Sequence, residues 1–230
     1  MSRQVPETAR LEIKFTAYES EADKLRMWLN LHSAGFYSPY PDRKVNNVYF
    51  DTYENYAYTE NLSGASARTK VRYRWYGESV YPDAGSLEIK CKRNYFGWKL
   101  RFRANAAPAA GDDSWKDIRN NLIQQLDPEA RLWLESNPQP VMINRYSREY
   151  YVSRDDKVRA TIDTRQSVYD QRYKGRPNIT HASNLPKTLV LELKFDRHDR
   201  DLAARIVQGL PVRISRNSKY MIAVQSVSGY

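Results

Sequence analysis

The chain alternates charged and apolar residues along much of its length, and this alternation limits the folds available to it. In RTKVRYRW (residues 68–75), cations at alternate positions are separated by Val71, Tyr73 and Trp75. Successive side chains of a β-strand point to opposite faces, so a period of two predicts a strand with one charged and one apolar face. The same period recurs in residues 10–16, 46–52, 87–94, 98–104, 158–164 and 189–196, and less regularly in 144–152.

Helical patterns are fewer and lie between these strands. Apolar residues at helical spacing predict helices in residues 19–32, 113–126, 127–137 and 199–210, the last followed by the stop signals Gly209 and Pro211. Residues 166–187 are polar and predict a long loop. We expect an α+β fold built as a closed antiparallel β-barrel of about eight strands with a few covering helices. No composition shift divides the chain, so residues 1–230 are expected to form one domain.

Charge and cysteine content narrow the class of protein. The 37 Lys and Arg residues exceed the 27 Asp and Glu residues, which gives a formal net charge of +10 and predicts an anionic partner. One cysteine excludes an intrachain disulfide and a thiolate zinc cluster. The sequence has neither an apolar run of membrane-spanning length nor a signal-peptide core at its start. We therefore expect a soluble cytoplasmic protein.

Two interpretations of the charged strand faces remain open. A face that carries charge is commonly just solvated, while the opposite face packs a core. Here, however, Lys and Arg recur on strand after strand, and like charges opposite one another destabilise a sheet. A barrel that closes around these cations would direct them into a tunnel, where a polyanion neutralises them. Arg and Lys suit phosphate oxygens, so the second interpretation predicts a phosphate-binding tunnel.

Three carboxylates recur in a common setting. Glu12, Glu88 and Glu192 each precede a lysine by two residues and so share its face. Such oxygen ligands suit Mg²⁺ or Mn²⁺ bound to phosphates, and the alternative is a local ion pair on each strand. The sequence contains neither a G-x-x-x-x-G-K-[ST] phosphate loop nor a G-x-G-x-x-G fingerprint, and its histidines are scattered. Catalysis by a histidine acid or base is therefore not expected.

Eight motifs in order resemble a known family, the VTC domain, which is the polyphosphate-polymerase branch of the triphosphate tunnel metalloenzymes (the CYTH-like superfamily). They are RLEIKF (10–15), NNVYFDT (46–52), RTKVRYRWYG (68–77), LEIKCKR (87–93), NRYSREYY (144–151), RATIDT (159–164), LVLELKF (189–195) and SKY (218–220). The resemblance implies a tunnel in which the terminal phosphoryl group of ATP is transferred to a growing polyphosphate chain with a divalent metal, Mn²⁺ or Mg²⁺.

The resemblance also implies roles for single residues. The cations expected to act in catalysis are Arg72, Arg74, Lys90, Arg148, Arg159 and Lys219. Further phosphate-binding cations are expected at Lys14, Lys70, Lys92, Arg101 and Lys194. The resemblance implies that Glu192 holds the metal, and the shared E-x-K pattern adds Glu12 and Glu88 as expected metal ligands.

One departure from the wider superfamily bears on the reaction. Many of its hydrolases and cyclases begin with E-x-E-x-K, whereas this chain has Arg10 at the first position. The loss of one carboxylate favours transfer over hydrolysis. The alternatives are a tripolyphosphatase or nucleoside triphosphatase with the same tunnel, and a polyphosphate-binding module without catalysis. Nucleic acid is not expected as a partner, and the oligomeric state is left open.

Overall fold

A computed structural model describes residues 4–80, 84–105 and 113–212 of the chain. Eight antiparallel strands form a single sheet with the order β1-β8-β7-β6-β2-β3-β4-β5. The strands are β1 (Leu11–Tyr18), β2 (Arg43–Asp51), β3 (Ala67–Tyr76), β4 (Gly85–Arg93), β5 (Phe96–Ala104), β6 (Gln139–Val152), β7 (Val158–Asp170) and β8 (Thr188–Phe195). The helices are α1 (Ala22–Leu31), α2 (Tyr56–Leu62), α3 (Trp115–Gln125), α4 (Pro128–Ser136) and α5 (Arg200–Ile206).

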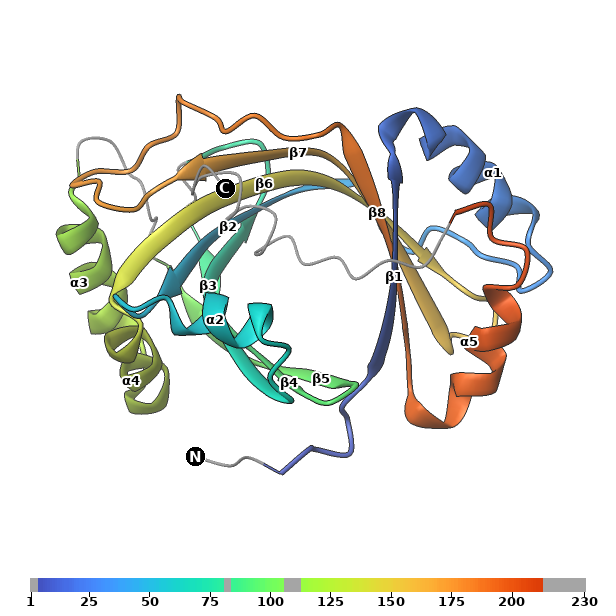
Figure 1. Ribbon diagram of the computed structural model, residues 1–230, viewed down its shortest axis with the longest axis horizontal. Coiled ribbons are helices and arrows are strands. Elements are labelled where there is room, and N and C mark those ends of the chain that lie inside the picture. Colours follow the sequence, from blue (N-terminus) through green and yellow to red (C-terminus); the bar gives the residue numbers. More distant parts are fainter. Residues whose placement is uncertain (1–3, 81–83, 106–112, 213–230) are drawn as a thin grey trace.

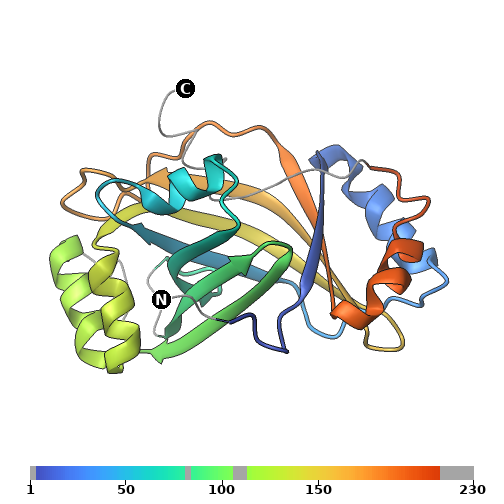
Figure 2. The same cartoon turned by 60° about the horizontal axis from the view of Figure 1, so that its bottom comes forward.

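The sheet curls until its two edges approach each other (Figures 1 and 2). Just before β1, Arg10 forms an antiparallel bridge with Gly97 of β5, and their backbone hydrogen bonds measure 3.0 and 2.9 Å. The expected α+β sheet of eight antiparallel strands is confirmed. The expected closed barrel is reached only at this bridge in the described residues, because no ladder of hydrogen bonds joins β1 to β5.

The apolar strand faces point outward and are covered by helices, as the alternation predicts. Tyr73 and Trp75 of β3 are fully buried in a core that includes Trp115 and Leu122 of α3. At another part of the same outer face, α1 and α5 cover β1, β7 and β8 through a second core that includes Leu25 and Leu29. Figure 1 shows α3 and α4 against one part of the sheet and α1 and α5 against another.

Local signals explain where the covering helices begin. Ser114 and Asp117 form a reciprocal capping box at the start of α3. Asp127 accepts a hydrogen bond from the Ala130 backbone at 2.9 Å, and Pro128 occupies the first turn of α4. The four predicted helices are confirmed as α1, α3, α4 and α5, although α5 ends at Ile206, earlier than expected.

Two features differ from the sequence-based expectations. The helix α2 was not predicted; buried Asp51 organises it by accepting hydrogen bonds from the backbone nitrogens of Ala57 and Tyr58 at 3.0 and 3.3 Å. The polar segment 166–187 begins as strand rather than loop, because β7 continues to Asp170 beside β6. Within the described part of the chain, no helix has the length and hydropathy needed to cross a membrane.

Candidate functional site

The charged residues of the strands share the inner face of the curled sheet, which we call the charged face. Direct cross-strand partners lie on the same face, and the register pairs Lys14 with Glu192, Lys70 with Lys90, and Arg148 with Asp163. The described residues of the charged face that form contacts below are Glu12, Lys14, Lys70, Arg72, Arg74, Glu88, Lys90, Lys99, Arg101, Arg148, Asp163, Glu192 and Lys194. A salt bridge of 3.4 Å from Lys90 of β4 to Glu12 of β1 crosses the interior between strands that are not neighbours.

Glu88 organises the first group of cations. Its carboxylate is fully buried and accepts hydrogen bonds from Arg72 Nε and Nη2 at 3.0 and 2.6 Å and from Lys99 Nζ at 2.9 Å. Arg74 and Arg101 lie 3.8 and 3.9 Å away. Burial raises the pKa of Glu88, but the cations, Arg72 first, outweigh it and hold the pKa well below its usual range. Glu88 is therefore an anion at neutral pH.

The two arginines of β3 are also held by neutral groups. Arg72 donates to the Tyr49 hydroxyl at 3.1 Å. Arg74 donates through Nε to Asn47 Oδ1 at 2.8 Å and through Nη2 to the Tyr146 hydroxyl at 3.0 Å. These contacts orient both guanidinium groups side by side on one strand. Fixed forks of this kind match the oxygens of a phosphate chain.

Arg148 has its own counter-ion on the neighbouring strand. Its Nε and Nη2 donate to the two carboxylate oxygens of Asp163 at 2.6 and 2.7 Å, and Asp163 is fully buried. Burial lowers the pKa of Arg148, but Asp163 outweighs it and raises the pKa well above its ordinary value. Arg148 therefore keeps its charge inside the sheet.

Lysines surround the other two carboxylates. Lys14 Nζ lies 2.9 Å from Glu12 and 3.4 Å from Glu192, and Lys194 contacts both carboxylates. Burial raises the pKa of Glu12, and so does Glu192, yet the lysines outweigh both and lower it to about 2. Glu12 raises the pKa of Lys90, but burial and the neighbouring cations bring it down to about 7. The positive charges of Lys14, Lys90 and Lys194 therefore lie close together and repel one another.

Lys70 shows the same crowding. Burial is the main cause that lowers its pKa well below the ordinary value, followed by the charges of Lys90 and Lys14. An added anion would relieve this mutual repulsion by keeping the lysines charged. The mutual repulsion of these lysines therefore favours the binding of an anion on the charged face.

A divalent metal fits this face at one place. Thr161 Oγ1 is buried without a hydrogen-bond partner, and Thr161 is directly paired with Glu192, whose Oε1 forms an ion pair with Lys194. Glu12 interacts electrostatically with Glu192 on the same face. The described residues contain no group of three His, Cys, Asp or Glu side chains placed to hold a metal. The protein would thus supply a few oxygens, and Mg²⁺ or Mn²⁺ commonly completes its shell with phosphate oxygens and water.

The structure brings most of the expected residues together, with three exceptions. Arg159 lies on the charged face opposite Lys194 but is exposed at its border. Lys92 is displaced toward the end of β4, opposite Arg68. Lys219, in the motif SKY, lies outside the described residues. Glu88, also expected at a metal, is surrounded by cations, as Glu12 and Glu192 are.

Sequence reasoning missed several residues that orient this set. Asp163, Tyr49, Asn47, Tyr146, Thr161 and Lys99 contact or adjoin the expected residues. Asp163, Thr161 and Lys99 carry a signal, because they alternate in phase with expected residues on their strands. Tyr146 carries the same signal, because it precedes Arg148 by two residues on β6, whereas Tyr49 and Asn47 carry none, because β2 holds none of the expected residues.

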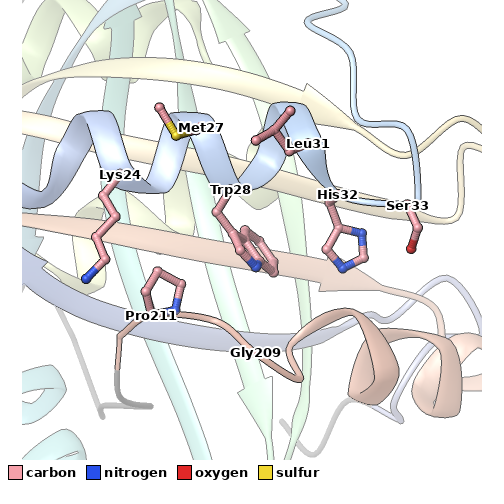
Figure 3. Close-up of a pocket in the computed structure, with 8 residues that line it drawn as sticks. All are labelled: Lys24, Met27, Trp28, Leu31, His32, Ser33, Gly209 and Pro211. Carbon is pink, nitrogen blue, oxygen red and sulfur yellow. The ribbon is translucent and has the colours of Figure 1, made fainter.

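A surface pocket lies elsewhere, between α1 and the segment after α5. Figure 3 shows Trp28 of α1, and His32 just after the helix, facing Gly209 and Pro211. Its lining is largely apolar, with Met27 among the exposed residues. It is separate from the charged face.

Comparisons with known proteins identify a family for the chain and solved structures of similar fold. The family model described as the VTC domain matches residues 9–228. No curated protein sequence matches the chain at a significant level. Among solved structures, the chain is similar to HpAC1 from Hippeastrum, a putative adenylyl cyclase described as having a dominant triphosphatase activity, with 14% identity, TM-score 0.53 and 96% of each chain covered. It is also similar to a putative adenylate cyclase from Vibrio parahaemolyticus, with 9% identity, TM-score 0.52, and 94% of this chain and 98% of that chain covered.

Proposed function

Because the chain belongs to the VTC domain family, we propose that it is a metal-dependent polyphosphate polymerase that transfers the γ-phosphoryl group of ATP to a growing polyphosphate chain. The observation that carries the proposal is the convergence of Arg72, Arg74 and Arg148 with a crowded group of lysines on one enclosed face. Phosphoryl transfer depends mainly on positioning and on stabilising charge, which such a face provides.

The contacts of each residue indicate its proposed role. Arg72, Arg74 and Arg148 are held rigidly and would bind phosphate oxygens along the chain. Lys14 and Lys90 would add compact positive charge where negative charge accumulates. Arg159, Lys92 and Arg101, together with Lys219, remain proposed phosphate ligands nearer the borders of the set.

Glu192 and Glu12, with Thr161, are the residues that would hold the metal. A bound Mg²⁺ or Mn²⁺ would offset the negative charge of the phosphate oxygens. Glu88 has a different proposed role, since its oxygens already accept hydrogen bonds from Arg72 and Lys99. It would position the guanidinium of Arg72 rather than bind metal.

The transfer needs no nucleophile from the protein. A terminal phosphate oxygen of the acceptor attacks the γ-phosphorus, the bond from that phosphorus to the β,γ-bridging oxygen breaks, and ADP leaves. Arg10, in place of a carboxylate, forms an exposed salt bridge with Asp196 at 3.3 Å and its backbone joins the sheet edges. It cannot activate a water molecule as a carboxylate would, which favours transfer.

Hydrolysis of tripolyphosphate or a nucleoside triphosphate is the second candidate. The dominant triphosphatase activity described for HpAC1, a protein of similar fold, favours it. Incubation with ATP and Mn²⁺, repeated with Mg²⁺, separates the two. A polymerase yields ADP together with a long polymer that an exopolyphosphatase digests. ADP and orthophosphate without polymer would instead establish the hydrolase.

Two further alternative functions predict different results in binding experiments. A polyphosphate-binding module would bind polyphosphate tightly without turnover at any metal concentration. A nucleic-acid-binding protein would prefer a single-stranded oligonucleotide to tripolyphosphate at equal salt, whereas we expect the reverse. One domain over residues 1–230 and a cytoplasmic location remain predictions.

A further inference from the structure

Three tyrosines surround one arginine at an end of the charged face. The guanidinium carbon of Arg43 lies 5.5, 5.8 and 5.9 Å from the ring centres of Tyr40, Tyr76 and Tyr150, respectively. Tyr40 and Tyr150 also meet edge to face, with ring centres 5.8 Å apart. We call these four residues the tyrosine cluster. Tyr40 is 55% exposed and Tyr76 40% exposed, so their rings are accessible to a ligand.

The strand register places the tyrosine cluster next to the phosphate-binding arginines. Tyr76 follows Arg74 by two residues on β3, so the two share a face. Tyr150 follows Arg148 in the same way on β6, and Arg43 is paired directly with Arg148. Two strand residues span about 7 Å. That is the scale of the ribose that separates the phosphates of a nucleotide from its base.

A phosphate chain alone does not account for this cluster. Phosphate oxygens accept hydrogen bonds and attract cations, but they offer no flat apolar surface to an exposed aromatic ring. A nucleobase does offer one, and bases stack on tyrosine rings and on the planar guanidinium of arginine. The cluster holds both kinds of platform, and it lies where the arginine row of β3 ends.

We propose that the tyrosine cluster binds the base of a nucleoside triphosphate whose phosphates lie along the charged face. The inference rests on the proposed function and adds a binding site for the non-reacting part of the substrate. The phosphate chain then runs from Arg74 toward Arg72 along β3, away from Tyr76. The base contributes affinity by stacking, and purines, which stack over a larger area, bind more tightly than pyrimidines.

The experiment compares ATP with inorganic tripolyphosphate, which lacks a base. Dissociation constants for both are measured by calorimetry in EDTA, which prevents metal-dependent turnover. The variants are Tyr40→Ala and Tyr76→Ala, with Tyr76→Phe to retain the ring. Tyr95→Ala is the matched control, because Tyr95 is 80% exposed in the turn between β4 and β5.

Each alanine variant is expected to bind ATP about tenfold more weakly, which is the scale of one lost base–aromatic contact. Tripolyphosphate binding stays within about twofold in the same variants, and Tyr76→Phe and Tyr95→Ala retain ATP affinity. Unchanged ATP affinity in both alanine variants, or equal losses for ATP and tripolyphosphate, would overturn the inference. Because Tyr40 lies in an exposed bend, its variant remains informative if Tyr76→Ala fails to fold.

The two proposals fail in different ways. An unmodified protein that does not bind tripolyphosphate contradicts the proposed function as well as the tyrosine site. An unmodified protein that binds tripolyphosphate, combined with variants that keep full ATP affinity, contradicts the tyrosine site alone. A preference for ATP over UTP that disappears in Tyr40→Ala supports stacking as the cause.

Discussion

Replacing Glu88 with glutamine tests whether this carboxylate organises the cations of the charged face. The change keeps the shape of the side chain and removes its charge. Glu88 accepts hydrogen bonds from Arg72 at 3.0 and 2.6 Å and from Lys99 at 2.9 Å. Without the carboxylate, Arg72 loses its ion pair with Glu88 and keeps its hydrogen bond to the Tyr49 hydroxyl.

The expected loss of stability follows from these contacts. Removing one partner of a buried ion pair costs about 3–5 kcal/mol, and one hydrogen bond to a charged group contributes about 1.5–3 kcal/mol. The Lys99 side chain is 48% exposed, so solvent screens its share. The new amide oxygen still accepts one hydrogen bond. We therefore expect Glu88→Gln to lower the free energy of unfolding by about 3 kcal/mol, or the melting temperature by roughly 6–12 °C.

A bound polyanion should recover part of this loss. Tripolyphosphate supplies the negative charge that Arg72 and Arg74 have lost, and it no longer meets repulsion from Glu88. If the variant binds it about fivefold more tightly, saturating ligand stabilises the variant by about 1 kcal/mol more than the unmodified protein. If the role of Glu88 were purely structural, tripolyphosphate would stabilise the variant and the unmodified protein equally.

The assay is urea unfolding followed by tryptophan fluorescence, with and without tripolyphosphate, in EDTA. Glu54→Gln is the control, because Glu54 is exposed and should change stability by less than about 0.5 kcal/mol. If Glu88→Gln has the same free energy of unfolding as the control, Glu88 does not organise the cations of the charged face. A large destabilisation that tripolyphosphate does not reduce refutes the compensation argument.

Three other predictions concern turnover, binding and pH. Glu192→Gln should abolish turnover while the circular dichroism spectrum stays unchanged, and activity retained across a Mn²⁺ titration contradicts a metal-binding role. Arg72→Ala or Arg74→Ala should each weaken tripolyphosphate binding by about 1.5–3 kcal/mol in calorimetry, since each removes a charge-assisted contact; unchanged affinity would place that arginine outside the site. The pKa of Lys90 is about 7 in the free protein, so its charge is present below that pH and is lost as pH rises through it. A bound phosphate raises this pKa, so binding at about pH 8 should take up a proton that calorimetry in two buffers detects and that Lys90→Arg removes.

The strand faces were predictable because they depend on nearest neighbours in the chain. Val71, Tyr73 and Trp75 alternate with cations, and all three are buried in a core beneath α3 and α4. The same reasoning placed Arg72 and Arg74 on one face, where the structure confirms them. The short helix α2 was not predictable in this way, because its start depends on Asp51, a strand residue whose carboxylate accepts from the helix backbone.

The sequence by itself therefore determined which residues share a face and that the protein is mostly antiparallel strand. Only the tertiary structure decided which charges meet. Glu88 and Glu192 occupy the same E-x-K pattern, yet Glu88 accepts hydrogen bonds from Arg72, whereas Glu192 forms ion pairs with Lys14 and Lys194. The physical reason is that alternation depends on adjacent residues, whereas the partner of a charge depends on strand order and register, which arise from contacts between distant parts of the chain.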